Sequence, residues 1–268
     1  MSTKLLNPKL SNIPETMLIP LRARYLETKT ENGIINDPKS VEILDGIDYD
    51  FSGKKGVSKG TQIGTAIRTE ILDEQTNKFL AHNPNSVVVN LGCGLDTRHH
   101  RLDNGIVTWF DLDLPGSIEF RKNFFNETYR FKFISKSFLD FSWVDQIPKS
   151  KPTLFIVEGL LMYFTEEEVK SLFKVISENF PDAEMLLEAM SPIMVKDSNQ
   201  HPDLKTYNAS FKWGIKTGKE IENWNIGANF VNEWYYFDRH RERAPFIYKI
   251  FILIPVFRKM MKIVHLKF

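Results

Sequence analysis

The segment 86–113 constrains the fold of this chain more than any other part of its sequence. It opens on three consecutive β-branched residues, the valines 87–89, which favour a buried strand. Gly92 and Gly94 follow, and glycine lets a chain turn tightly and lets its backbone approach a ligand closely. The segment therefore predicts a strand that ends in a glycine turn, as in nucleotide-binding α/β proteins.

A second apolar run, residues 106–110, leads directly into two acids, Asp111 and Asp113. About 20 residues after such a glycine turn, a carboxylate can accept two hydrogen bonds from a ribose diol. Side chains alternate along a strand, so both acids face the same way and either can fill this role. Together the turn and the acids predict a nucleoside-binding crevice on a parallel α/β sheet.

The rest of the chain continues the alternation of strands and helices. We expect helices over 61–81 and 115–129, and a third that starts at Thr165 with a capping box to Glu168. We expect seven strands, the last two forming an antiparallel edge on a mostly parallel sheet, over residues 86–91, 106–111, 131–135, 153–157, 183–187, 230–237 and 262–268.

Composition excludes several classes of protein. A length of 268 residues suits one domain, and a net charge of +1 without a Lys/Arg-rich block argues against nucleic acid as a partner. A single cysteine, Cys93, excludes an internal disulfide, and the first ten residues lack a signal-peptide core, so we expect a cytoplasmic protein. The apolar stretch 246–257 is too short to span a membrane, and we expect a core or lid helix there, with membrane-surface attachment as the alternative.

The absence of one glycine narrows the range of possible ligands. A dinucleotide fingerprint places a third glycine three residues after the second, and this chain has Thr97 there. A dinucleotide oxidoreductase is therefore disfavoured. S-adenosylmethionine (SAM) carries no phosphate, and a glycine turn followed by a late acid meets its needs.

Several motifs resemble one family. The segments VVVNLGCGLDTR, WFDLDLP and FIVEGLLMYF, preceded by ARYLET, the NDP of 36–38 and GTAIRTEILDE, look like the leucine carboxyl methyltransferase family, and closest to its bacterial branch of polyketide O-methyltransferases. The likeness runs from about residue 14 to 190. It implies a Rossmann-like class I methyltransferase fold with N-terminal helices and a helical lid, and SAM as the cofactor.

The resemblance also implies roles for individual residues. Gly92 and Gly94 would lie under the methionine and ribose of the cofactor, with Asp113, or alternatively Asp111, on the ribose. Arg68 matches the arginine that pairs with the cofactor carboxylate, and a guanidinium fork suits a carboxylate.

Two further cofactor contacts concern charged residues. Arg24 would supply a second cation, with Arg22 and Lys29 as alternatives. Glu158 directly follows an apolar strand, where an unpaired charge is costly to bury and where parallel strands bind ligands. The family places this glutamate beside the methionyl amine.

The adenine contacts are less well defined by the resemblance. Ser137 and Phe138 stand where the family contacts adenine. The eukaryotic members have an acid near this place, whereas this chain has Ser137, with Asp140 close by.

The catalytic residues are not identified by any motif. The candidates are Tyr163, which would close the acceptor pocket or alternatively pack in the core, and His201 and His240, which lie in the expected lid. The histidines show no metal-ligand spacing, and adjacent His99 and His100 point apart on a helix.

Function follows from the chemistry of methyl transfer. A carboxylate is ionised at neutral pH and needs no general base, whereas a phenol benefits from one, so the lack of a fixed base favours a carboxylate acceptor over a hydroxyl. We expect a SAM-dependent O-methyltransferase acting on a small molecule. The alternatives are a protein C-terminal carboxyl methyltransferase and a non-catalytic SAM-binding protein.

The expected domain is one methyltransferase unit with four parts. These are an N-terminal helical cap (1–80), a SAM-binding core (81–190), a lid or substrate region (191–245), and a C-terminal helix and strand (246–268). Four aromatics in the third part could stack on a planar acceptor or simply pack together: Tyr207, Phe211, Trp213 and Trp224.

Overall fold

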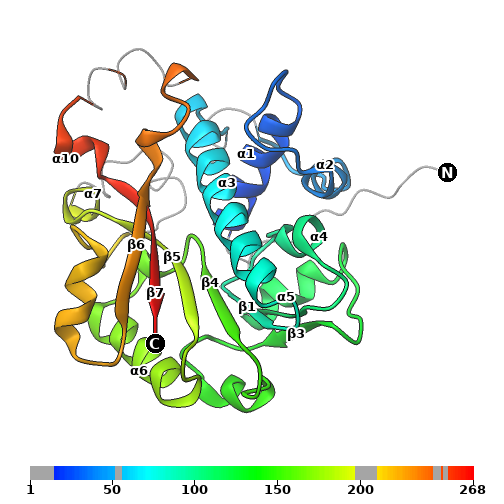
Figure 1. Ribbon diagram of the computed structural model, residues 1–268. Helices are drawn as coiled ribbons and strands as arrows, with labels where there is room; N and C mark the ends of the chain where they lie inside the picture. The colour runs from blue at the N-terminus through cyan, green and yellow to red at the C-terminus, as the bar shows by residue number, and fades with distance from the viewer. Residues whose placement is uncertain (1–14, 52–55, 197–209, 244–248, 250–252) are drawn as a thin grey trace.

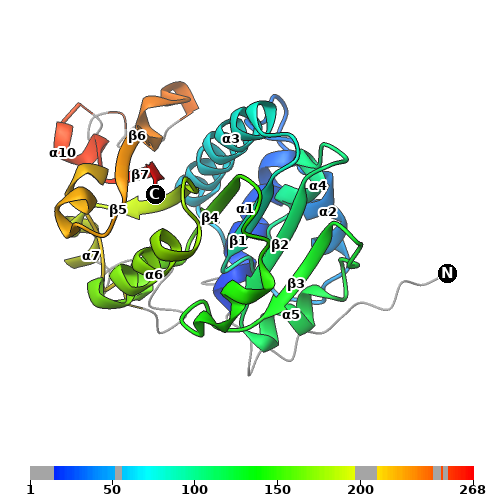
Figure 2. The ribbon, with the colours of Figure 1, turned by 60° about the horizontal axis from the view of Figure 1, so that its bottom comes forward.

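The computed structural model describes residues 15–51, 56–196, 210–243, 249 and 253–268. Its centre is a seven-stranded sheet with the order β3-β2-β1-β4-β5-β7-β6 (Figures 1 and 2). The first five strands are parallel, and β7 runs antiparallel between β5 and β6. The strands are β1 Val87–Leu91, β2 Thr108–Asp113, β3 Phe131–Ser135, β4 Thr153–Val157, β5 Glu184–Met190, β6 Asn229–Tyr235 and β7 Met261–Lys267. The predicted mixed sheet with its antiparallel edge is confirmed.

Helices cover both faces of this sheet (Figure 1). The α-helices are α1 Leu18–Thr28, α2 Pro38–Asp45, α3 Lys59–His82, α4 Arg98–Leu102, α5 Pro115–Arg121, α6 Glu166–Asn179, α7 Pro192–Lys196 and α10 Pro255–Arg258. Short 3-10 turns include η2 Glu15–Met17, η5 Leu161–Tyr163, η7 Gly218–Trp224 and η8 Tyr236–Asp238. The predicted capping box is present at the start of α6, where Thr165 and Glu168 exchange bonds.

The central strands are apolar on both sides because each side carries its own core. Val87 and Val89 of β1 pack in one cluster with the buried stripe of α6. Val88 faces the other way, into a cluster with α1, α2 and α3. All residues of β1 and β4 are buried, as expected for parallel strands covered on both faces.

Several boundaries differ from the prediction, most of them by one or two residues. β2 starts at Thr108, two residues late, because Asn104 accepts the N–H groups of Ile106 and Val107 and forms a turn there. The helix predicted over 115–129 ends at Arg121. β5 extends to Met190 because β7 pairs with it along that length.

The C-terminal apolar stretch is only partly described. Within 246–257, residues 249 and 253–257 are described, and they hold the start of the short α10, with Leu253 79% exposed, which does not fit a core helix. No helix of the described ranges has the length and apolar character to cross a bilayer. The aromatics Trp213 and Trp224 pack on each other, Trp213 being buried in the core, and Tyr207 lies outside the described residues.

Candidate cofactor site

The carboxyl ends of three neighbouring strands meet at one edge of the sheet. The register pairs Leu91 at the end of β1 with Leu112 of β2 and Val157 of β4. The strand order reverses between β1 and β4, and open α/β sheets bind ligands at such a point. The glycine turn, Asp113 and Glu158 therefore lie together at the expected place.

The turn after β1 requires both of its glycines. Gly92 has a φ of 67°, and a Cβ there would lie 2.9 Å from the Leu160 side chain. Gly94 has a φ of 45°, and a Cβ would lie 3.3 Å from Cβ of Met17. The Gly92 N–H donates to the Leu112 carbonyl at 2.8 Å, which ties the turn to β2. A side chain at either position would strain the backbone and crowd the turn.

Asp113 closes over this turn. Its Oδ2 accepts the Gly94 N–H at 2.7 Å, and its Oδ1 accepts the Leu114 N–H at 2.7 Å. The residue is half-buried, and the Ser117 side chain also acts on its carboxylate. Burial raises the pKa of this carboxyl above its ordinary value. Each carboxylate oxygen can accept more than one hydrogen bond, so Asp113 is suited to bind a diol as well.

Asp111 has a different environment although it lies on the same strand. It is fully buried, it accepts the Trp109 indole N–H at 3.0 Å, and it pairs with Arg121. Arg121 in turn donates to the Gly94 carbonyl at 2.9 Å. Burial raises the pKa of Asp111 to about 6. Asp111 thus reaches the turn only through Arg121, whereas Asp113 accepts a hydrogen bond from the turn directly.

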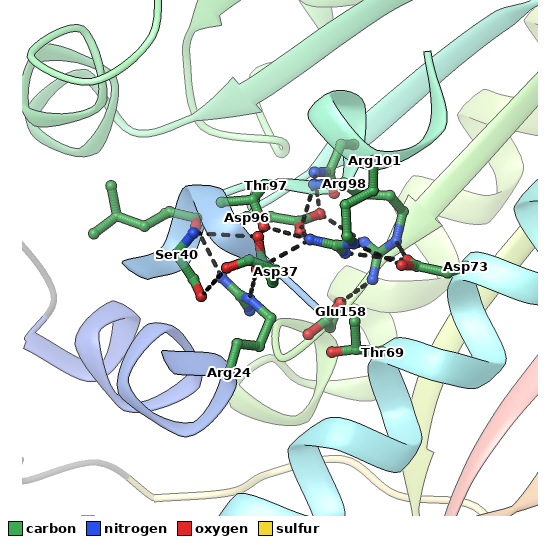
Figure 3. A network of polar contacts seen from close by, with 12 residues as sticks. Arg24, Asp37, Ser40, Thr69, Asp73, Asp96, Thr97, Arg98, Arg101 and Glu158 are labelled. Atoms are coloured by element: carbon green, nitrogen blue, oxygen red, sulfur yellow. Dashed lines mark hydrogen bonds and ion pairs between the residues drawn. The ribbon is translucent and has the colours of Figure 1, made fainter. Parts of the chain in front are cut away.

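Glu158 lies in a buried network of charges beneath the turn (Figure 3). It pairs with Arg68 and with Arg98, each at 2.7 Å. Arg98 is fully buried and also binds Asp96 at 2.6 Å and Asp73 at 2.7 Å. Burial opposes ionisation of Glu158 and Asp96, but the arginines outweigh it and hold both pKa values below the ordinary range.

The same network reaches the N-terminal helices (Figure 3). Arg24 of α1 is 2% exposed; it binds Asp37 at 3.0 Å and donates to the Leu95 carbonyl at 2.9 Å. Asp37 also accepts from the Thr97 hydroxyl at 2.5 Å and pairs with Arg101 at 3.1 Å. Arg24, predicted as a cofactor contact, is therefore engaged with protein partners that join α1 to the glycine turn.

Arg68 of α3 connects the network to β5. Its Nη1 donates to both carboxylate oxygens of Glu188, at 2.9 and 3.1 Å, and its Nη2 pairs with Glu158. Its Nε is buried and has no hydrogen-bond partner. Glu188 also accepts the Gly159 N–H at 2.8 Å and the Tyr236 hydroxyl at 2.8 Å. The free Nε of Arg68 can donate to a carboxylate, and Glu158 beside it can accept from an ammonium group. The two side chains together therefore suit a zwitterionic ligand.

Of the two catalytic candidates that the structure describes, Tyr163 lies near this cluster and His240 does not. Its ring packs against Phe211, with centroids 5.4 Å apart, and the charge of Glu188 acts on its phenol. His240 binds Glu70 at 2.9 Å, and Glu70 follows Arg68 on α3 by two residues, which turns it to another side of the helix. His201 lies outside the described residues.

The predicted adenine contacts follow β3. The Lys136 N–H donates to the Asp113 carbonyl at 2.9 Å, which brings this loop beside Asp113. The hydroxyl of Ser137 accepts the Leu139 N–H at 3.2 Å, and Phe138 packs edge-on against Phe164 in the core. Within the described residues, no cluster of His, Cys, Asp or Glu has the arrangement of a metal site.

Residues that carry no predicted role are packed. Cys93 is buried, and burial raises the pKa of its thiol well above the ordinary value, so it stays a neutral thiol. His99 stacks on Phe131 with centroids 3.9 Å apart, and burial lowers its pKa to about 4.

Sequence reasoning missed several members of the site. Asp96 and Arg98 directly follow the glycine turn, and their charges beside a buried strand were a usable signal. Glu188 is a charged residue among the buried residues 185–190 of β5, which is an equally visible anomaly. Asp37 lies in the NDP motif of 36–38, but that motif did not indicate its ion pairs with Arg24 and Arg101.

The profile of the leucine carboxyl methyltransferase family matches residues 18–177. The chain belongs to this family. It is 32% identical over 240 residues to "Tetracenomycin polyketide synthesis O-methyltransferase TcmP" of Streptomyces glaucescens, a match that covers 89% of this chain and 87% of that protein. It is 27% identical to "S-adenosyl-L-methionine-dependent methyltransferase dpfgK" of Gibberella zeae, with 82% and 81% covered.

Solved structures confirm the fold. A DUF574 family protein from Streptomyces avermitilis matches with a TM-score of 0.60 at 11% identity, covering 92% of this chain and 96% of that one. A SAM-dependent methyltransferase from Mesorhizobium loti matches with a TM-score of 0.51 at 13% identity, covering 72% and 96%. The predicted Rossmann-like class I methyltransferase fold is therefore correct.

This family member is a SAM-dependent O-methyltransferase, and SAM is its cofactor. The residues at the site fit that molecule. Carboxylates at the ends of β2 and β4 suit a ribose diol and an ammonium group.

Proposed function

We propose that this enzyme methylates a carboxylate of a small molecule to give a methyl ester. The observation that carries the proposal is the state of Tyr163 beside the charged cluster. Burial, together with the charge of Glu188, raises the pKa of its phenol to about 12. At neutral pH the phenol stays protonated, so it can donate a hydrogen bond but cannot act as a base. An acceptor that is already ionised needs only such a donor.

The cofactor placement follows from the donor set. We assign the cofactor carboxylate to Arg68, its ammonium group to Glu158, and its ribose to Asp113 over the glycine turn. Bound SAM supplies a methyl group on a sulfonium, with a neutral thioether as leaving group. The chain itself orients the acceptor in line and excludes water, and such positioning can contribute roughly 7–11 kcal/mol.

The choice of a small molecule rests on the relatives. TcmP is named for polyketide synthesis, and the match covers nearly the whole length of both chains. A hydroxyl acceptor is the second candidate, since TcmP is named only as an O-methyltransferase.

The deciding experiment uses SAM labelled in its methyl group and pairs of aromatic and aliphatic acceptors that carry either a carboxylate or a hydroxyl. Methyl esters release labelled methanol in mild alkali, whereas methyl ethers do not. We expect alkali-labile label with carboxylate acceptors. Alkali-stable label on hydroxyl acceptors alone would overturn the carboxylate assignment.

The role of Tyr163 is tested by the Tyr163→Phe variant. Loss of one hydrogen bond to a charged acceptor should lower kcat/KM about tenfold, as expected for about 1.5 kcal/mol. The pH profile should keep its shape below pH 10 in both proteins, because the phenol does not titrate there. Tyr129→Phe, at a residue that is 83% exposed, is the control. An acidic limb that moves only in Tyr163→Phe would contradict the donor role.

A further inference from the structure

Glu188 is a buried carboxylate whose partners all belong to the cofactor end of the site. The register of β4 and β5 pairs Val157 with Leu187, so Glu158 and Glu188 follow side by side. Glu188 is 2% exposed and accepts four hydrogen bonds, two from Arg68, one from the Gly159 N–H and one from the Tyr236 hydroxyl. These side-chain contacts join β5 to α3, to the loop after β4 and to η8.

The guanidinium of Arg68 is divided between two carboxylates. Its Nη1 donates to Glu188, its Nη2 pairs with Glu158, and its Nε is buried without a hydrogen-bond partner. Glu158 has a second arginine, Arg98, whereas Glu188 has none besides Arg68 among its described ion pairs. The bond to Glu158 is therefore the one that a ligand can replace at lower cost.

We propose that Glu188 is the positioning residue for the cofactor carboxylate. When Glu158 turns to the cofactor ammonium group, Glu188 alone keeps Arg68 in place, and Arg68 keeps Nε and Nη2 as donors for the carboxylate. Tyr236 completes the arrangement. Burial raises the pKa of its phenol well above the ordinary value, so it remains a donor that orients Glu188. This inference rests on the proposed assignment of Arg68 to the cofactor carboxylate.

The test compares two ligands by calorimetry: S-adenosylhomocysteine, and the analogue that lacks only its carboxylate. The ratio of their Kd values measures recognition of the carboxylate. We expect the unmodified enzyme to prefer S-adenosylhomocysteine at least tenfold. Glu188→Gln should reduce that preference to less than threefold, with the Kd of the decarboxylated analogue changed less than threefold.

Three controls separate the possible failures. Glu184→Gln removes a carboxylate from the same strand, where it binds His265 at 2.7 Å, and should leave the preference unchanged. Tyr236→Phe removes a single hydrogen bond and should lower the preference two- to fivefold, which provides a measurement if Glu188→Gln does not fold. Arg68→Ala should abolish the preference.

The outcomes distinguish the inference from the function. Equal weakening of both ligands in Glu188→Gln, or an unchanged preference, would overturn the positioning role while the assignment of Arg68 stands. If the unmodified enzyme shows no preference between the ligands, the assignment of Arg68 itself fails.

Discussion

Replacing Arg98 with methionine is expected to lower the free energy of unfolding by about 3–5 kcal/mol. Arg98 is fully buried and neutralises Asp96, Asp73 and Glu158 at distances of 2.6–2.7 Å. Methionine fills a similar space but leaves these carboxylates with fewer counter-charges in a low-dielectric environment. Urea unfolding followed by circular dichroism measures the loss.

The matched control for this change is Arg130→Met. Arg130 pairs with Asp103 at 2.6 Å near the surface, where water screens the charges. Arg130→Met should lower the free energy of unfolding much less than Arg98→Met does. Equal losses in the two variants would show that the buried network contributes no more than a surface ion pair.

Glu158→Gln is expected to weaken binding of S-adenosylhomocysteine roughly 10- to 100-fold, as for a lost charged hydrogen bond of about 1.5–3 kcal/mol. The glutamine keeps the shape of the side chain but cannot pair with an ammonium group. Arg68→Ala should weaken binding of S-adenosylhomocysteine by a similar factor. Calorimetric titration measures both affinities, after thermal unfolding has shown that each variant is folded.

Glu166→Gln is the control for the loss of a glutamate charge. Glu166 lies at the start of α6, is exposed, and pairs with Lys170 at 2.5 Å. The affinity of Glu166→Gln for S-adenosylhomocysteine should match that of the unmodified enzyme. Unchanged affinity in both Glu158→Gln and Arg68→Ala would contradict the placement of the methionyl end of the cofactor.

Local patterns predicted the strands at the centre of the sheet. The bounds of β3 and β4 are as predicted, because their β-branched and aromatic residues lie between clear turn signals. Helix α6 was equally predictable from its capping box and apolar stripe. The end of a strand was not predictable where it depends on pairing with a distant strand. β5 extends to Met190 because β7 pairs with it along that length.

The candidate site divides in the same way. Gly92, Gly94 and Glu158 were identified because a glycine turn and a charge after an apolar strand are local signals. The choice between Asp111 and Asp113 was not local. It depends on Arg121 and Trp109, which occupy Asp111, and on the Gly94 N–H, which holds Asp113 at the turn.

The sequence by itself determined the fold class, the family and the edge of the sheet that we propose for the cofactor, because periodicity and short motifs act over a few residues. Only the tertiary structure decided how the charges pair. Arg68 meets Glu188 across 120 positions of the chain, and Arg24 meets the Leu95 carbonyl across 71. Buried charges require partners, and chain topology rather than neighbouring residues selects which ones they meet.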